Sequence, residues 1–224
     1  MTTSDVTGRF RVASGEVSWI LNDATDAVAV LVFGHGAGAN MRHASMTSIA
    51  TELARRGVAV LRFNFPFMED AKQRVDSRAV STATVAAAVA QARDLKRQLP
   101  LFLGGHSFGG RMASHAVLDR DLGDVRGLVF CSFPLHPSGQ PAIGRADHLD
   151  SIVAPMLFLS GTRDALAERE LLESVIERLG ARAELVWLDT ADHSYKVLKR
   201  SRARSDSVFD ELADAAVRFV NRLC

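Results

Sequence analysis

The fold of this chain is decided by the segment Leu101-Phe102-Leu103-Gly104-Gly105-His106-Ser107-Phe108-Gly109-Gly110-Arg111. Its first residues form an apolar run typical of a buried strand, and the residues from Gly110 to Leu118 have the composition of a helix. Between them lies a G-x-S-x-G motif centred on Ser107, which forms a nucleophile elbow when a strand precedes it and a helix follows. Such a strained turn requires small neighbours, because backbone packs against backbone. That requirement is met by Gly105, Gly109 and Gly110.

Short apolar runs alternate with amphipathic stretches along the rest of the chain. The runs are nearly continuous in Val, Leu, Phe and Ala, as in strands of a parallel sheet that is covered on both faces. They occupy residues 28–33, 58–63, 101–104, 127–132, 155–160 and 184–188. Helical patterns lie near residues 46–53, 85–99, 172–179 and 208–219, and residues 8–21 have room for two antiparallel strands. This order predicts a doubly wound, mostly parallel α/β sheet that is flanked by helices.

Length and composition indicate one ordinary globular domain. The chain has 224 residues, of which 47% are hydrophobic and 24% charged, so we expect a single domain over residues 1–224. Residues 133–154 are too few for a separate cap domain, which predicts a shallow site covered by loops. The net charge of +1 gives no global field that would favour nucleic acid. The clearest apolar run, residues 27–33, is too short to cross a bilayer, so we expect no membrane partner.

The cysteine and histidine patterns argue against several other classes of protein. Two cysteines, Cys131 and Cys224, cannot form a disulfide framework, and the first residues have neither a basic nor an apolar signal segment. The expected compartment is therefore the cytoplasm. No paired C-x-x-C and no H-E-x-x-H motif is present, so we expect neither a metal nor a cofactor.

Three residues with complementary chemistry follow three of the predicted strands. Ser107 follows the strand at 101–104, Asp164 follows the strand at 155–160, and His193 follows the strand at 184–188. Ligands in an open α/β sheet bind beyond the carboxyl ends of the strands, so we expect these side chains to meet. A neutral imidazole can remove the serine proton, and a carboxylate on the other ring nitrogen fixes the tautomer. The alternatives to Asp164 are Asp189 and Asp192, which are nearer to His193 in the sequence.

The glycine-rich loop at residues 34–38 is the expected second half of this site. An oxyanion hole needs two backbone N–H groups near the developing negative charge. One normally belongs to the residue after the nucleophile, here Phe108, and the other to the loop after the third strand, here Ala37 with Gly36 as the alternative. A nucleotide-phosphate turn is the competing interpretation. The loop lacks both the G-x-G-x-x-G register and the lysine of a P-loop, which disfavours it.

Further residues near the strand ends are candidates for substrate contact. We name Gly36, Phe65 and His136, although aromatic clusters are more often core and His136 can equally shape its loop. A basic run also follows the loop of His193. It is either a solvated face or a rim that attracts an anionic substrate or partner. The run consists of Lys196, Lys199, Arg200, Arg202 and Arg204.

From about residue 28 onward the chain resembles the α/β-hydrolase superfamily. More narrowly it is similar to the hydrolase-like domains of NSL-complex subunit 3 and testis-expressed protein 30, which group near the dienelactone hydrolases. The stretches with this resemblance are GHGAG at 34–38, RFNFP at 62–66, GGHSFGGRMA at 104–113, FPLHP at 133–137, GTRD at 161–164 and DHS at 192–194. The resemblance implies the α/β-hydrolase fold and the nucleophile, acid and base roles of Ser107, Asp164 and His193. Dienelactone hydrolases use a cysteine nucleophile, and this chain has Ser107 instead.

Together the residues predict a serine hydrolase that cleaves a carboxylic ester or a related acyl bond through an acyl-enzyme on Ser107. The expected partner is a small-molecule acyl substrate. Two alternatives remain open at the level of sequence. A thioesterase or peptidase would use the same three residues, and a non-catalytic interaction module would keep only the fold.

Overall fold

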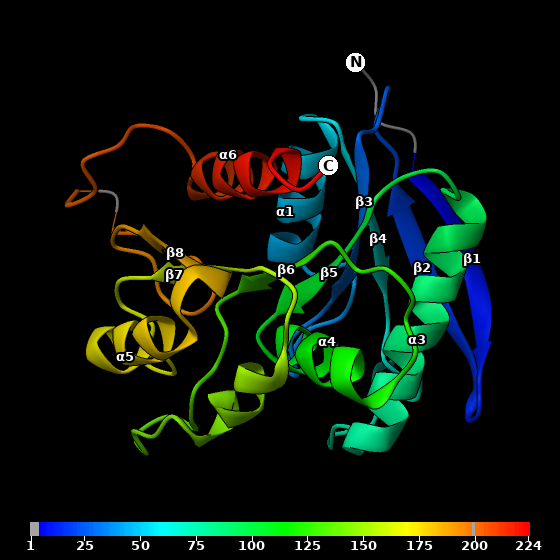
Figure 1. Cartoon of the computed structure of the whole chain (residues 1–224), viewed down its shortest axis with the longest axis horizontal. Helices are drawn as coiled ribbons and strands as arrows, with labels where there is room; N and C mark the ends of the chain where they lie inside the picture. The colour runs from blue at the N-terminus through cyan, green and yellow to red at the C-terminus, as the bar shows by residue number, and fades with distance from the viewer. Residues whose placement is uncertain (1–4, 199) are drawn as a thin grey trace.

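The computed structural model describes residues 5–198 and 200–224, whose strands form one eight-stranded sheet (Figure 1). The spatial order is β1-β2-β4-β3-β5-β6-β7-β8. Strands β3 to β8 run parallel to one another. Strands β1 and β2 form an antiparallel hairpin, and β2 joins it to the sheet by pairing antiparallel with β4. The strands are β1 (Asp5–Val12), β2 (Gly15–Asn22), β3 (Ala29–Gly34), β4 (Val58–Phe63), β5 (Leu101–His106), β6 (Gly127–Cys131), β7 (Met156–Gly161) and β8 (Ala183–Leu188).

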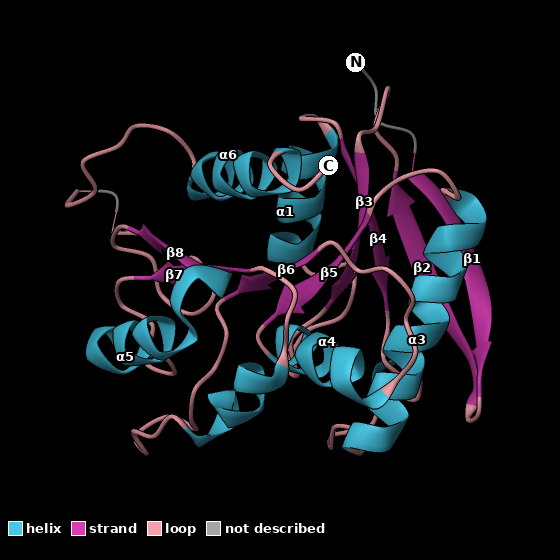
Figure 2. Ribbon diagram, in the orientation of Figure 1, coloured by secondary structure: helices cyan, strands magenta, loops and turns pink. Residues whose placement is uncertain are grey.

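Helices cover both faces of the sheet (Figure 2). Helices α1 (Ala44–Ala54) and α6 (Val208–Asn221) share one apolar core with the sheet. The opposite face packs against α3 (Arg78–Leu95), α4 (Phe108–Asp119) and α5 (Arg169–Leu179). Three short helical segments lie in loops. They are α2 (Pro66–Glu69) and the 3₁₀ helices Gly144–Ser151 and Gly180–Arg182.

This double cover explains the continuous apolar runs of the sequence. Every residue of β3, β4, β5, β6 and β7 is buried, because helices pack on both sides of these strands. The edge strands differ: β1 is mostly exposed, and β8 is half-buried. The prediction of a doubly wound, mostly parallel sheet is confirmed, including the antiparallel hairpin near the N-terminus.

One predicted helix has different bounds in the structure. The pattern at residues 85–99 indicated a helix that reaches Pro100, whereas α3 starts at Arg78 and ends at Leu95. The earlier start follows from Ser77, whose side chain accepts a hydrogen bond from the Val80 N–H. The chain leaves the helix at Lys96, where φ is −134° and ψ is 50°. Leu99 therefore packs against the core from a loop.

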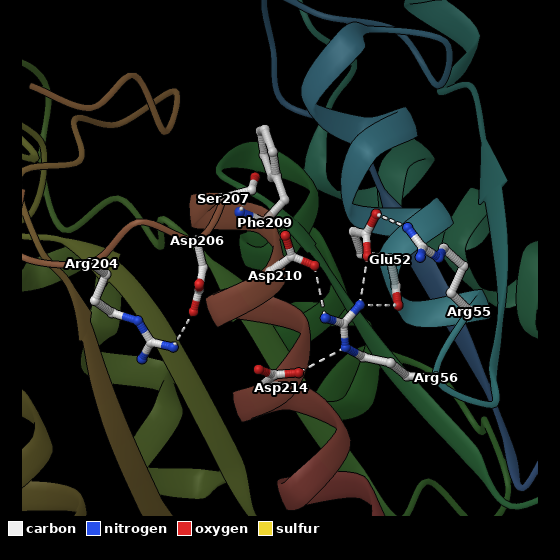
Figure 3. Close-up of polar contacts among 9 residues, drawn as sticks. All are labelled: Glu52, Arg55, Arg56, Arg204, Asp206, Ser207, Phe209, Asp210 and Asp214. Carbon is white, nitrogen blue, oxygen red and sulfur yellow. Dashed lines mark hydrogen bonds and ion pairs between the residues drawn. The ribbon is translucent and has the colours of Figure 1, made fainter. Parts of the chain in front are cut away.

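Polar contacts fasten α1 to α6 on the outer surface (Figure 3). Arg56 donates hydrogen bonds to Asp210 and Asp214 of α6, at 2.8 Å each, and to Glu52 of α1 at 2.6 Å. These carboxylates raise the pKa of Arg56 above its ordinary value against the opposing effect of desolvation, which is the largest single influence. These contacts hold α6, the last helix of the chain, against α1.

The segments around the site are loops and short turns. Between β6 and β7 the chain forms only a loop and the 3₁₀ helix Gly144–Ser151, so the described residues contain no separate cap domain. Each helix in residues 5–198 and 200–224 is too short or too polar to span a membrane.

Candidate active site

Ser107 occupies a strained turn between β5 and α4. Its φ is 52° and its ψ is −113°, a conformation that L-residues rarely adopt. The backbone packs so closely here that a Cβ on Gly109 would lie 2.2 Å from the carbonyl oxygen of Gly34. On Gly105 it would lie 2.5 Å from the same oxygen. The glycines of the motif thus let β5 and α4 meet β3, which leaves Ser107 at the carboxyl edge of the sheet.

Ser107, His193 and Asp164 form a continuous chain of hydrogen bonds. The Ser107 Oγ lies 2.9 Å from His193 Nε2. On the other side of the ring, His193 Nδ1 lies 2.9 and 2.8 Å from the two carboxylate oxygens of Asp164. With Asp164 ionised, the Nδ1–H donates to the carboxylate and Nε2 accepts from the serine hydroxyl. The Asp164 side chain is fully buried, while 22% of the His193 side chain is exposed toward the cleft.

The loops after β7 and β8 bring Asp164 and His193 together. A Cβ on Gly161, at the end of β7, would lie 2.3 Å from the carbonyl oxygen of Ala191, so only glycine permits this contact. Asp164 is held by the Leu166 N–H, which donates to its Oδ1 at 2.8 Å. The carboxylate therefore has a fixed orientation before any substrate binds.

Neither alternative carboxylate contacts the histidine ring. Asp192 Oδ1 accepts hydrogen bonds from the N–H groups of Ser194 and Lys196, at 2.9 Å each, and so shapes its own loop. Asp189 lies exposed at the surface.

The loop at residues 34–38 is fastened by a buried histidine. The Nδ1 of His35 donates to the Gly36 carbonyl at 2.8 Å, and its Nε2 accepts from the Phe65 N–H at 3.0 Å. Burial lowers the pKa of His35 to about 4, which keeps the ring neutral and able to make both bonds at pH 7. The loop bearing Ala37 is thereby tied to the loop after β4.

A second buried histidine, His106, supports the loop of His193. Its Nε2–H donates to the backbone carbonyl of His193 at 2.9 Å. Burial, and secondarily the charge of His193, lowers the pKa of His106 to about 4, so the ring is neutral. His106 is not singled out by the sequence for this contact. Its only local signal was its position directly before Ser107.

Two cavities meet at Ser107. The smaller, of about 250 Å³, is lined on one side by Gly36, Ala37 and His43 and on the other by His193 and Ser194. The larger, of about 390 Å³, lies toward α4 and is lined by Phe108 and Met112. Ala37 and Ser107 belong to both. Within the described residues, no group of three or more His, Cys, Asp or Glu side chains could hold a metal ion.

A family model for an alpha/beta hydrolase domain matches residues 27–221. This chain belongs to the α/β-hydrolase family. Its fold is similar to that of dienelactone hydrolase from Anabaena variabilis, with a TM-score of 0.78 at 18% identity, over 99% of this chain and 98% of that one. An alpha-beta serine hydrolase homologue from Coxiella burnetii matches with a TM-score of 0.72 at 18% identity, over 99% and 97% of the two chains.

The structure of a serine hydrolase without a lid, from Xanthomonas campestris, is also similar. The TM-score is 0.72 at 18% identity, over 99% of this chain and 95% of that one. At such identities the likeness extends to the fold. Family and fold together support a hydrolase with an uncapped site.

Two residues that we expected to contact substrate are buried elsewhere in this α/β hydrolase. Phe65 is fully buried, and its ring packs edge-on against Phe63 and Phe108. His136 has a fully buried side chain whose Nδ1 bonds to the Pro137 carbonyl and whose Nε2 lies 3.1 Å from Glu168. Neither lines the two cavities, whereas Gly36 lines the smaller one.

The basic run of this α/β hydrolase is not uniformly solvated. Lys196 and Arg200 are exposed, and Lys199 lies outside the described residues. Arg202 differs, because only 3% of its side chain is exposed and it pairs with Glu211 of α6. Arg204 pairs with Asp206 and also with Glu211. Among the described members of the run, two therefore have carboxylate partners, and the run is not a uniform row of free cations.

Proposed function

We propose that this α/β hydrolase cleaves a carboxylic ester or a related acyl bond through an acyl-enzyme formed on Ser107. The single observation that supports this proposal best is the unbroken hydrogen-bond chain from Ser107 Oγ through the His193 ring to the buried Asp164 carboxylate. The residues of the chain come from three separate loops at one edge of the sheet. We also propose that residues 1–224 form a single domain.

The proposed reaction begins with proton transfer. His193 Nε2 takes the hydroxyl proton of Ser107 as Oγ attacks the carbonyl carbon of the substrate. Asp164, on the opposite nitrogen, stabilises the imidazolium. His193 then gives the proton to the leaving oxygen, the bond to that oxygen breaks, and the acyl-enzyme remains. Water then attacks the acyl-enzyme in the same way. His193 takes a proton from the water and returns one to Ser107 Oγ, and the carboxylic acid is released.

The backbone supplies the proposed stabilisation of negative charge. The N–H groups of Phe108 and Ala37 belong to the two segments that flank Ser107, and both residues line the cavities that meet there. They are our candidates for the oxyanion hole, with Gly36 as the alternative to Ala37. Loss of one such donor lowers kcat by about 10²–10³.

A non-catalytic module is the less supported alternative. The left-handed conformation of Ser107 costs about 1–3 kcal/mol, and a buried carboxylate aimed at a histidine adds a desolvation cost. A scaffold gains nothing from either feature. A thioesterase or peptidase would use the same residues, and no contact in the structure favours these substrates over an ester.

The experiment is hydrolysis of 4-nitrophenyl acetate and butyrate by the wild type and two variants. Ser107→Ala is expected to lower kcat about 10⁴-fold or more, because it removes the nucleophile. Ser174→Ala is the matched control, since this serine lies exposed on α5 and its hydroxyl donates only to the Leu171 carbonyl of the same helix. Undiminished turnover by the Ser107→Ala variant would refute the proposal.

A further inference from the structure

The larger cavity beside Ser107 contains an unusual concentration of arginine. Its volume of about 390 Å³ falls within the range of small-molecule pockets, about 300–1,000 Å³. Apolar walls come from Met112 and Leu166. Three arginines and one aspartate also line it, namely Arg78, Arg111, Arg145 and Asp76.

The charges in this cavity do not cancel. Arg78 is neutralised, because it makes a two-pronged ion pair with Asp119 of α4. Arg111 and Arg145 have no carboxylate within ion-pair distance among the residues the structure describes. Asp76 is the remaining acid, and its Oδ2 already accepts the Phe67 N–H at 2.8 Å. The cavity therefore keeps an excess of positive charge.

Arg111 shows most directly that a partner is missing. Its Nε is buried and makes no hydrogen bond within the described part of the chain. Burial, and then the charge of Arg145, lowers the pKa of Arg111 below its ordinary value, although a guanidinium remains protonated. A half-buried charge without a counter-ion is destabilising, and an anion bound by the two arginines would lower this penalty.

Neighbouring histidines do not change this charge balance. His115 and His148 stack with their ring centroids 3.7 Å apart, and Ser114 Oγ lies 2.7 Å from His148 Nε2. Burial, followed by neighbouring positive charges, lowers the pKa of each ring to about 4. Both rings are neutral at pH 7, so the free positive charge belongs to the arginines.

The position of His193 assigns the two cavities to the two halves of an ester. His193 gives its proton to the leaving group, and it lines only the smaller cavity. The leaving group therefore occupies the smaller cavity, and the acyl chain extends from Ser107 into the larger one. This assignment rests on the proposed function.

We propose that the substrate has an acyl chain that ends in a carboxylate, and that Arg111 and Arg145 bind this carboxylate. The substrate class is thus the monoester of a dicarboxylic acid. A guanidinium fork matches a carboxylate in shape and charge, and the apolar walls of the cavity accommodate the methylene chain. Arg111 stands one helical turn after Ser107 in α4, so the nucleophile and the anion site are positioned by the same element.

The test compares two esters that differ in one charge: mono-4-nitrophenyl adipate and its methyl ester. Both release 4-nitrophenolate, and the rate of the Ser107→Ala variant is subtracted as background. We expect the wild type to have the higher kcat/KM on the carboxylate ester. In Arg111→Met this preference is expected to fall about 10- to 100-fold, and Arg145→Met is expected to lower it as well. Arg97→Met is the control, because the side chain of that arginine is 79% exposed in the loop after α3.

Binding of free adipate, measured by calorimetry, separates the inference from the proposed function. We expect adipate to bind the wild type and Arg97→Met, and to bind Arg111→Met at least about tenfold more weakly. Circular dichroism of each variant confirms that it is folded. Equal kcat/KM on both esters without adipate binding would overturn the inference and leave the proposed function standing. A preference that survives in Arg111→Met would overturn the assignment to this cavity. Adipate binding without hydrolysis of either ester would overturn the proposed function and support the anion site.

Discussion

At the scale of single residues, His106 has a role that only the three-dimensional structure reveals. Its Nε2–H donates to the backbone carbonyl of His193, and this bond holds the loop that presents the His193 ring, our proposed base, to Ser107. We expect His106→Ala to lower kcat about tenfold with little change in KM, since one hydrogen bond of about 1–1.5 kcal/mol positions the base. Steady-state kinetics on 4-nitrophenyl butyrate measures both constants.

His106→Gln is the matched variant for this prediction. A glutamine Nε2 can donate to the same carbonyl, so we expect it to restore most of kcat. If the alanine and glutamine variants were equally impaired, or if only KM changed, His106 would be a packing residue and not a positioning residue.

The meeting of Ser107, Asp164 and His193 could be predicted because each residue lies in the loop just after a strand of recognisable sequence. The bond of His106 could not, since its partner lies 87 residues away and its register depends on the loop after β8. The burial of Phe65 and His136, which we named as candidates for substrate contact, could not be predicted for a related reason. Being beside a strand end does not determine which way a side chain points, and both rings point into the protein.

At the scale of secondary-structure elements, the packing of α4 against β3 depends on one glycine. A Cβ on Gly109 would lie 2.2 Å from the Gly34 oxygen and 2.3 Å from its carbon, and both atoms are backbone. We expect Gly109→Ala to lower the free energy of unfolding by about 3 kcal/mol or more, because neither element can move without disturbing the sheet. Urea denaturation measures this change.

Gly38→Ala is the control for this substitution. A Cβ there meets nothing within 4 Å, and Gly38 lies in the loop that follows β3. We expect its unfolding free energy to stay within about 0.5 kcal/mol of the wild type. A Gly109→Ala protein as stable as the Gly38→Ala protein would contradict the account of the elbow.

The predictability of the elements follows from burial. The strands from β3 to β7 are apolar throughout because both faces are covered, so their sequences gave a clear signal. The helix α2 and the 3₁₀ helix Gly144–Ser151 gave none, because segments of four and eight residues are too short to show a clear helical period. The walls of the larger cavity come partly from this unpredicted 3₁₀ helix, which contributes Arg145.

At the scale of the whole molecule, buried histidines make folding sensitive to pH. The pKa of His35 and that of His106 fall from 6.5 to about 4 on folding, chiefly through burial. Between these values the unfolded chain binds protons that the folded protein excludes. Stability is therefore full above pH 6.5 and declines as the pH falls toward 4, by about 3 kcal/mol for each ring.

Urea unfolding at pH 7.5 and pH 4.5 measures this decline. We expect a large loss, since domains of this kind have total stabilities of about 5–15 kcal/mol. His106→Gln, which does not titrate, is expected to show a smaller loss than the wild type. Equal stability of the wild type at both pH values would contradict the burial of neutral histidines.

The most direct test of the central claim is covalent labelling of the folded protein with a fluorophosphonate, followed by mapping of the modified residue by mass spectrometry. Our central claim is that His193 and Asp164 make Ser107 nucleophilic. We therefore expect one label per chain, attached to Ser107. The label is expected to be absent from Ser107→Ala and slower to form on Asp164→Asn. A folded wild-type protein that resists the reagent, or a label attached to a different residue, would contradict the account.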